Sequence, residues 1–70
     1  MSDMQSFLIY CIELYASNNN ISGKEAYNIF ERNNIYAYIH DTYEALHTIS
    51  DEMILDDIAA LLGEKRRKAV

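Results

Sequence analysis

The chain has 70 residues, half of them hydrophobic and 24% charged, and its formal net charge is −5 at pH 7. This length permits one domain, and the composition is typical of a globular protein rather than a disordered one. The single cysteine, Cys11, excludes an internal disulfide and a cysteine-based zinc site. Stability must therefore come from an efficient helical core, from self-association or from a partner.

An apolar run near the N-terminus predicts a buried helix rather than a targeting signal. Residues 7–12 are apolar, but Asp3 precedes them where a signal peptide carries cations, and Glu13 interrupts the run. The run is also too short to cross a bilayer. We therefore expect a cytoplasmic protein without a membrane-spanning segment.

The first predicted helix covers residues 4–17, and its apolar residues recur at the i, i+3, i+4, i+7 spacing. These residues are Met4, Phe7, Leu8, Cys11, Leu14 and Tyr15. Ile9 and Ile12 extend the apolar surface beyond one stripe. The helix is therefore either central in the core or partly covered by another chain. Residues 17–20, a serine and three asparagines, predict a loop.

The second predicted helix covers residues 23–32 and buries Ala26, Ile29 and Phe30. Ser22 and Glu25 have the spacing of a capping box, in which each side chain bonds to the backbone amide of the other residue. Asn33 and Asn34 then suit a left-handed turn that ends the helix.

Two further helices are predicted over residues 35–47 and 51–62. The apolar face of the first consists of Ile35, Ile39, Thr42, Tyr43 and Leu46, and that of the second of Ile54, Leu55, Ile58, Leu61 and Leu62. Ser50 is placed to cap the last helix, and Gly63 to end it. The expected fold is all-α, a compact bundle of four short helices.

Charge divides the chain into an acidic body and a basic tail. We expect a single helical domain over residues 1–63 and a tail over residues 64–70, which holds Lys65, Arg66, Arg67 and Lys68. An acidic body repels nucleic acid, and four tail charges are few for tight phosphate binding. A basic protein surface is therefore the better-matched partner. In an alternative interpretation, the four cations of the tail form a nucleic-acid-binding site.

Catalytic and metal chemistry find little support in the residue pattern. His40 and His47 are seven residues apart, about 10 Å along a helix, which is too far for both to bind one metal. The serines and Cys11 lack a credible base with an orienting group. We expect no enzyme activity, no cofactor and no small-molecule substrate. The helix over residues 35–47 has no Lys or Arg, which argues against DNA reading by that helix.

Six tyrosines against two phenylalanines suggest an interaction surface. Tyr36 and Tyr38 cannot both face the core with Ile35 and Ile39, so at least one is expected at the surface. The candidate partner-binding residues are Tyr36, Tyr38, Asp41, Glu44, Ile9 and Ile12. In the alternative interpretation, all six tyrosines lie at the rim of the core.

Several strings along the chain are distinctive: FLIYCIE (7–13), SGKEAY (22–27) with Phe30, Tyr38-Ile39, YEALHT (43–48) and Asp56-Asp57-Ile58. They resemble those of the bacterial domain-of-unknown-function 3791 family. The resemblance covers about residues 5–60. The Ile49-Ser50 pair departs from the family, where a glycine is expected, and the basic tail lies outside the resemblance.

The resemblance implies an antitoxin-like or accessory partner of an adjacent toxin-like protein, one that itself resembles ADP-ribosyltransferases. It supplies no catalytic residues. We therefore predict a small non-catalytic protein-binding module that also self-associates as a homo-oligomer. A dimeric DNA-binding transcriptional regulator and a purely structural homo-oligomer are the alternatives.

Overall fold

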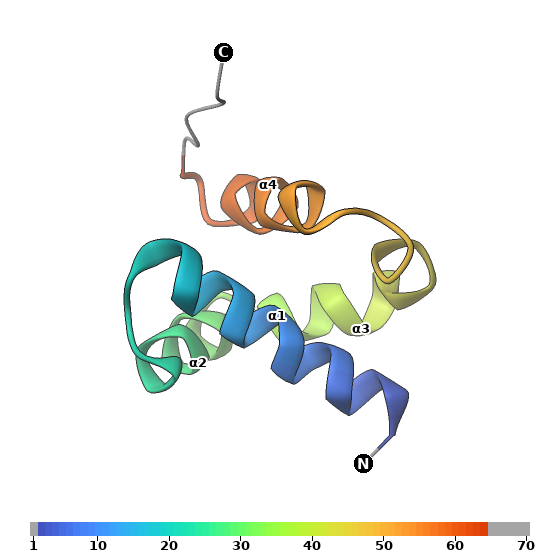
Figure 1. Cartoon of the computed structure of the whole chain (residues 1–70), viewed down its shortest axis with the longest axis horizontal. Helices are drawn as coiled ribbons and strands as arrows, with labels where there is room; N and C mark the ends of the chain where they lie inside the picture. Colours follow the sequence, from blue (N-terminus) through green and yellow to red (C-terminus); the bar gives the residue numbers. More distant parts are fainter. Residues whose placement is uncertain (1, 65–70) are drawn as a thin grey trace.

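The computed structural model describes residues 2–64 and contains four α-helices (Figure 1). They are α1 (Asp3–Asn19), α2 (Gly23–Arg32), α3 (Ile35–Leu46) and α4 (Asp51–Leu61). No strand occurs within the described residues. The predicted all-α bundle of four short helices is therefore confirmed, and the bounds of α2, α3 and α4 agree with those predicted to within one residue.

Helix α1 is the central element of the bundle. Figure 1 shows α1 crossing the middle of the molecule, with α2 on one side and α3 and α4 on the other. It packs against all three of the other helices. This central position accounts for the part of its wide apolar surface that meets the other three helices.

A serine caps three of the four helices. The hydroxyl of Ser22 accepts the backbone N–H of Glu25 at 3.1 Å, and that of Ser50 accepts the N–H of Met53 at 3.3 Å. Of the capping box predicted at Ser22, only the bond from the Glu25 amide to the Ser22 hydroxyl forms. A complete box lies instead at the start of α1, where Ser2 and Gln5 exchange both bonds at 3.1 Å. Each bond satisfies an N–H that has no partner within its helix.

The end of α1 differs from the prediction. Residues 17–19, expected in a loop, continue the helix, and the chain turns at Asn20, which adopts a left-handed conformation (φ 55°). The Asn19 side-chain amide donates to the carbonyl of Tyr15 at 2.9 Å. This asparagine therefore satisfies a carbonyl at the helix end instead of breaking the helix. Asn34 and Gly63 adopt left-handed conformations where helix ends were predicted.

The core is built from all four helices. Its buried residues are Cys11, Tyr15, Ala16, Ala26, Phe30, Ile35, Ile39, Leu46, Ile54, Leu55, Ile58 and Ala59. The placement of Leu61 on the buried face of α4 was wrong, because its side chain is 47% exposed. Ala59 takes the inward position, since it follows Leu55 by four residues and lies on the same side of the helix.

Candidate functional site

An open apolar groove lies where α1, α2 and α3 meet. Its lining residues are Gln5, Leu8, Ile9, Ile12, Tyr27 and Tyr36, and its volume is about 360 Å³. Gln5 is the one amide side chain in this lining. We call this surface the α1–α3 groove.

One wall of the groove is a single stripe of α1. Gln5, Leu8, Ile9 and Ile12 follow the i, i+3, i+4, i+7 spacing, so they lie on one side of the helix over two turns. This side adjoins the face that buries Cys11 and Tyr15, but it is only partly covered by the bundle. Ile9 and Ile12, which extend the apolar surface of the first predicted helix beyond one stripe, therefore belong to this wall of the groove.

The opposite wall is a pair of tyrosines from α2 and α3. The rings of Tyr27 and Tyr36 are tilted, with their centroids 5.5 Å apart, and the Tyr36 hydroxyl donates to the Tyr27 carbonyl at 3.5 Å. Tyr36 also meets the buried ring of Phe30 edge-on at 5.9 Å. Burial, the neighbouring Tyr27 and the negative charge of Glu31 raise the pKa of Tyr36 to about 12, so its hydroxyl is protonated at neutral pH.

Large apolar side chains remain open to solvent on both walls. Ile9 is 41% exposed and Tyr27 is 46% exposed, whereas Leu8, Ile12 and Tyr36 are half-buried. Exposed apolar patches on small proteins often mark interaction sites. The groove therefore offers apolar area that the bundle itself does not cover.

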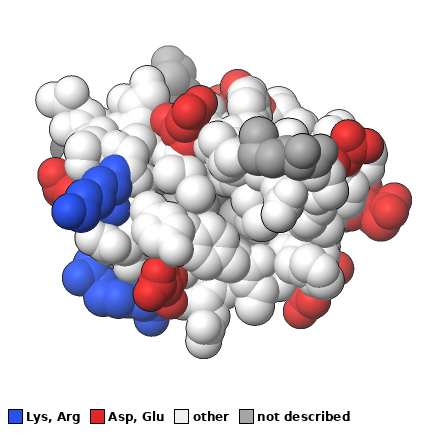
Figure 2. All heavy atoms as spheres, turned by 90° about the horizontal axis from the view of Figure 1, so that it is seen from below, with Lys and Arg blue, Asp and Glu red and all other residues white. Residues whose placement is uncertain are grey.

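Charges surround this uncharged surface unevenly. Figure 2 shows a largely uncharged face with the Lys and Arg side chains gathered at one side and acidic side chains spread over the rest. Within residues 2–64 the only Lys and Arg are Lys24 and Arg32, both in α2. Glu13 lies one helical turn beyond Ile9 on α1, and Glu31 lies one turn beyond Tyr27 on α2. The margin of the groove thus holds carboxylates from two helices, together with Lys24, which lies one turn before Tyr27 on α2.

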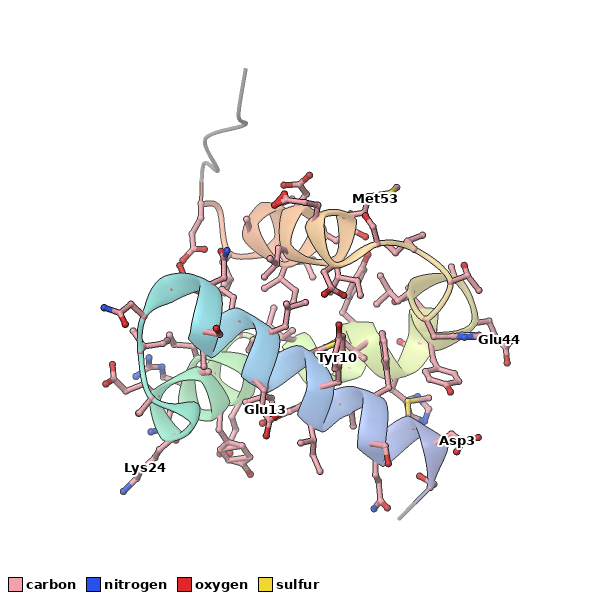
Figure 3. All side chains as sticks on the ribbon, in the orientation of Figure 1. Asp3, Tyr10, Glu13, Lys24, Glu44 and Met53 are labelled. Atoms are coloured by element: carbon pink, nitrogen blue, oxygen red, sulfur yellow. The ribbon has the colours of Figure 1, made fainter. Side chains whose placement is uncertain are left out.

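Only half of the predicted partner-binding residues meet in this groove. Ile9, Ile12 and Tyr36 line it together. Tyr38, Asp41 and Glu44 do not: the half-buried Tyr38 directs its hydroxyl to Asp57 of α4 at 3.5 Å, and exposed Asp41 lies 3.5 Å from the Nδ1 atom of His40. Figure 3 places exposed Glu44 at the far end of the molecule from Lys24.

Three tyrosines bear on the predicted interaction surface. Tyr36 and Tyr38 are both half-buried, and Tyr36 reaches the surface where it lines the groove. Tyr27, which was not among the candidates, is the exposed aromatic residue of the groove. Its position follows from the pattern of α2: since Ala26 and Phe30 are both inward, Tyr27 must point about 100° away from the core.

The remaining predicted features lie elsewhere or outside the structure. The basic residues Lys65, Arg66, Arg67 and Lys68 lie outside the described residues. Within the described part of the chain, no group of three or more His, Cys, Asp or Glu side chains is placed to hold a metal ion. No helix in residues 2–64 combines the length and apolar character needed to span a bilayer.

A family model described as protein of unknown function (DUF3791) matches residues 6–65. The match covers most of the chain, which therefore belongs to this family, and the resemblance of its motifs is confirmed. Neither a curated protein nor a solved structure matches the chain.

Proposed function

We propose that this member of the DUF3791 family is a non-catalytic cytoplasmic module that binds a protein partner in the α1–α3 groove. The observation that carries the proposal is the pair of large apolar side chains, Ile9 and Tyr27, that stay about half exposed on opposite walls. Covering them with a partner would remove apolar area from water, at about 25 cal/mol per Å². A small bundle with little core of its own gains stability from such a complex.

The partner we propose is an adjacent toxin-like protein, towards which this chain acts as an antitoxin-like or accessory subunit in bacteria. The resemblance implies this role, and the charge of the chain supports it. The acidic body favours a basic surface, as many nucleotide- and nucleic-acid-modifying proteins have. A single continuous groove on the chain supports stoichiometric binding of one partner.

DNA binding by the folded helices has less support. The two cations within residues 2–64 lie in α2, whereas α3, the second helix of the α2–α3 pair, carries none. A recognition helix reads bases and phosphates mainly through basic and amide side chains. Self-association is the other alternative, and it would use the same exposed apolar surface.

Co-expression with the product of the adjacent gene tests the proposal. The two chains should elute together in size-exclusion chromatography with light scattering, at a fixed ratio. Ile9→Ala and Tyr27→Ala should each weaken the complex by about tenfold or more, as expected for central anchor residues. Met53→Ala is the matched control, because Met53 is 53% exposed on α4 and does not line the groove.

Either of two results would overturn the proposal. One is the absence of any complex between the two purified chains at micromolar concentration. The other is a complex that Ile9→Ala and Tyr27→Ala leave as tight as Met53→Ala does, which would place the interface outside the groove.

A further inference from the structure

The groove also indicates which kind of partner segment it can accept, an inference that rests on the proposed function. An extended peptide would need backbone partners along its length, as a sheet edge provides. Within residues 2–64 there is no strand, and among the groove's lining residues Gln5 has the one amide side chain. A helix satisfies its own backbone groups internally. An apolar groove between helices therefore suits a helical segment.

The dimensions of the groove agree with a short amphipathic helix. The α1 stripe from Gln5 to Ile12 spans two turns, about 10 Å. A partner helix with apolar residues at i, i+3, i+4 and i+7 presents a stripe of the same length. Such a stripe would lie between Ile9 on one wall and Tyr27 on the other.

The charges around the groove favour basic residues at the flanks of that helix. Residues 2–64 hold all 11 acidic side chains of the chain against Lys24 and Arg32. Glu31 is close enough to Tyr36 for its charge to act on the phenol, and Tyr27 shows 46% of its surface. An aromatic pair beside a carboxylate favours a cation over the ring face. A second copy of this body would bring acidic helices instead, and like charges would oppose it.

We propose that the α1–α3 groove binds an amphipathic helix of the partner protein with basic flanks, and that a Lys or Arg of this helix lies over Tyr27 beside Glu31. The apolar stripe of the helix covers Leu8, Ile9 and Ile12, and its cations meet Glu13 and Glu31 at the margin. The apolar contacts provide most of the affinity, and the carboxylates select basic helices over acidic ones.

Three synthetic peptides serve as probes. Each has about 14 residues, enough for almost four helical turns. The first has Leu at the i, i+3, i+4, i+7 positions and Lys at the flanks, the second has Glu in place of Lys, and the third is a scrambled form of the first. Binding of the labelled peptides to the full chain is followed by fluorescence anisotropy.

The first peptide should bind at least about tenfold more tightly than the other two. Ile9→Ala and Tyr27→Ala should each weaken it by about tenfold, whereas Leu61→Ala, which changes an exposed side chain of α4, should have no effect. Glu31→Gln should weaken it by about fivefold, in line with one exposed cation–π and charge contact, and Glu44→Gln should not.

Equal binding of the scrambled peptide would overturn the inference, as would insensitivity to Ile9→Ala and Tyr27→Ala. Tighter binding of the Glu-flanked peptide as well as the first one by the K65Q/R66Q/R67Q/K68Q variant would mean that the chain's own tail occupies the groove, because the added negative charge alone would weaken the Glu-flanked peptide. A homodimer that Ile9→Lys dissociates would assign the groove to a second copy. If the adjacent gene product binds through Ile9 and Tyr27 but the first peptide does not, the proposed function stands and this inference fails.

Discussion

Tyr15 of α1 donates its hydroxyl to both carboxylate oxygens of Glu64, at 3.0 and 3.3 Å, across 49 residues of sequence. Glu64 follows α4, so this contact ties the end of α4 to the central helix. The hydroxyl of Tyr10 bonds to Asp51 at the start of α4, and that of Tyr38 approaches Asp57 in the middle at 3.5 Å. Three tyrosines therefore hold α4 to α1 and α3 through its carboxylates.

Tyr15→Phe tests this attachment at its most buried point. The substitution keeps the ring beside Phe30 but leaves the Glu64 carboxylate without its donor, so the free energy of unfolding should fall by about 1–2 kcal/mol. Urea unfolding followed by circular dichroism measures it. Tyr10→Phe is the control and should cost less, because Tyr10 is 45% exposed and water can replace its bond. An equal loss of unfolding free energy in both variants would show that burial does not strengthen the Tyr15 hydrogen bond.

Alkaline pH should unfold the protein through the same tyrosine. Burial, and then the hydrogen bond to Glu64, raise the pKa of Tyr15 from 10.0 to about 12. In the unfolded chain this phenol loses its proton near pH 10, before the folded chain does. Its contribution to stability is therefore complete below about pH 10 and is lost as the pH rises from 10 to 12.

Melting temperatures between pH 8 and pH 12.5 measure this effect, with the wild type compared with Tyr15→Phe. The variant should lose less stability between pH 10 and 12 than the wild type does, because it has no phenol at that position. Tyr36 contributes over the same range in both proteins, since its pKa is also raised to about 12. Parallel curves for the two proteins would show that Tyr15 does not titrate differently in the folded state.

Cys11 should be chemically inert while the protein is folded. Its side chain is fully buried, and burial raises the pKa of the thiol from 9.0 to about 12, with a smaller effect from Asp51. Thiolate is the reactive form, so a thiol reagent at pH 8 should modify Cys11 only as fast as the chain opens. The rate should rise steeply near the urea midpoint. Rapid reaction without denaturant would place Cys11 at the surface.

Ser22→Ala should lower the free energy of unfolding by about 1 kcal/mol, because the variant loses the hydroxyl that accepts the N–H of Glu25 at 3.1 Å. The matched control is Glu25→Ala, which removes any side-chain acceptor for the Ser22 amide. The return bond from Glu25 to that amide does not form, so this change should have little effect on the cap. Thermal unfolding of the two variants provides the comparison. A loss in Glu25→Ala as large as that in Ser22→Ala would indicate a complete capping box.

The helical period predicted much of the fold because buried residues in every helix recur at three- or four-residue spacing. Ile35, Ile39 and Leu46 are buried as predicted, and the caps at Ser22 and Ser50 form where the sequence placed them. The period could not predict the end of α1, because asparagine is compatible with both loops and helix ends. In the structure Asn19 stays in the helix, and its side chain donates to the Tyr15 carbonyl at 2.9 Å.

The groove could be predicted only in part for a related reason. The excess apolar surface of Ile9 and Ile12 was visible in the sequence, but the opposite wall depends on how α2 and α3 cross α1. A helical pattern shows which residues share a side of one helix and does not show which neighbour that side meets. Tyr38 illustrates this limit, since its position on α3 directs it towards Asp57 of α4 and away from Tyr36.

The last prediction separates binding from stability within the tyrosine pair. Tyr27→Ala removes a side chain that is 46% exposed together with its contact to the Tyr36 ring, so the unfolding free energy should fall by only about 1 kcal/mol. Tyr36→Ala removes a half-buried ring that packs on the buried Phe30, and it should cost about 2 kcal/mol or more. Urea unfolding of the isolated chain measures both values. Tyr27→Ala is therefore the informative variant for the interface, because a weaker complex would then reflect a lost contact rather than a loosened bundle. If Tyr27→Ala instead destabilises the isolated chain as much as Tyr36→Ala does, Tyr27 belongs to the core, and the wall of the groove must be assigned to other residues.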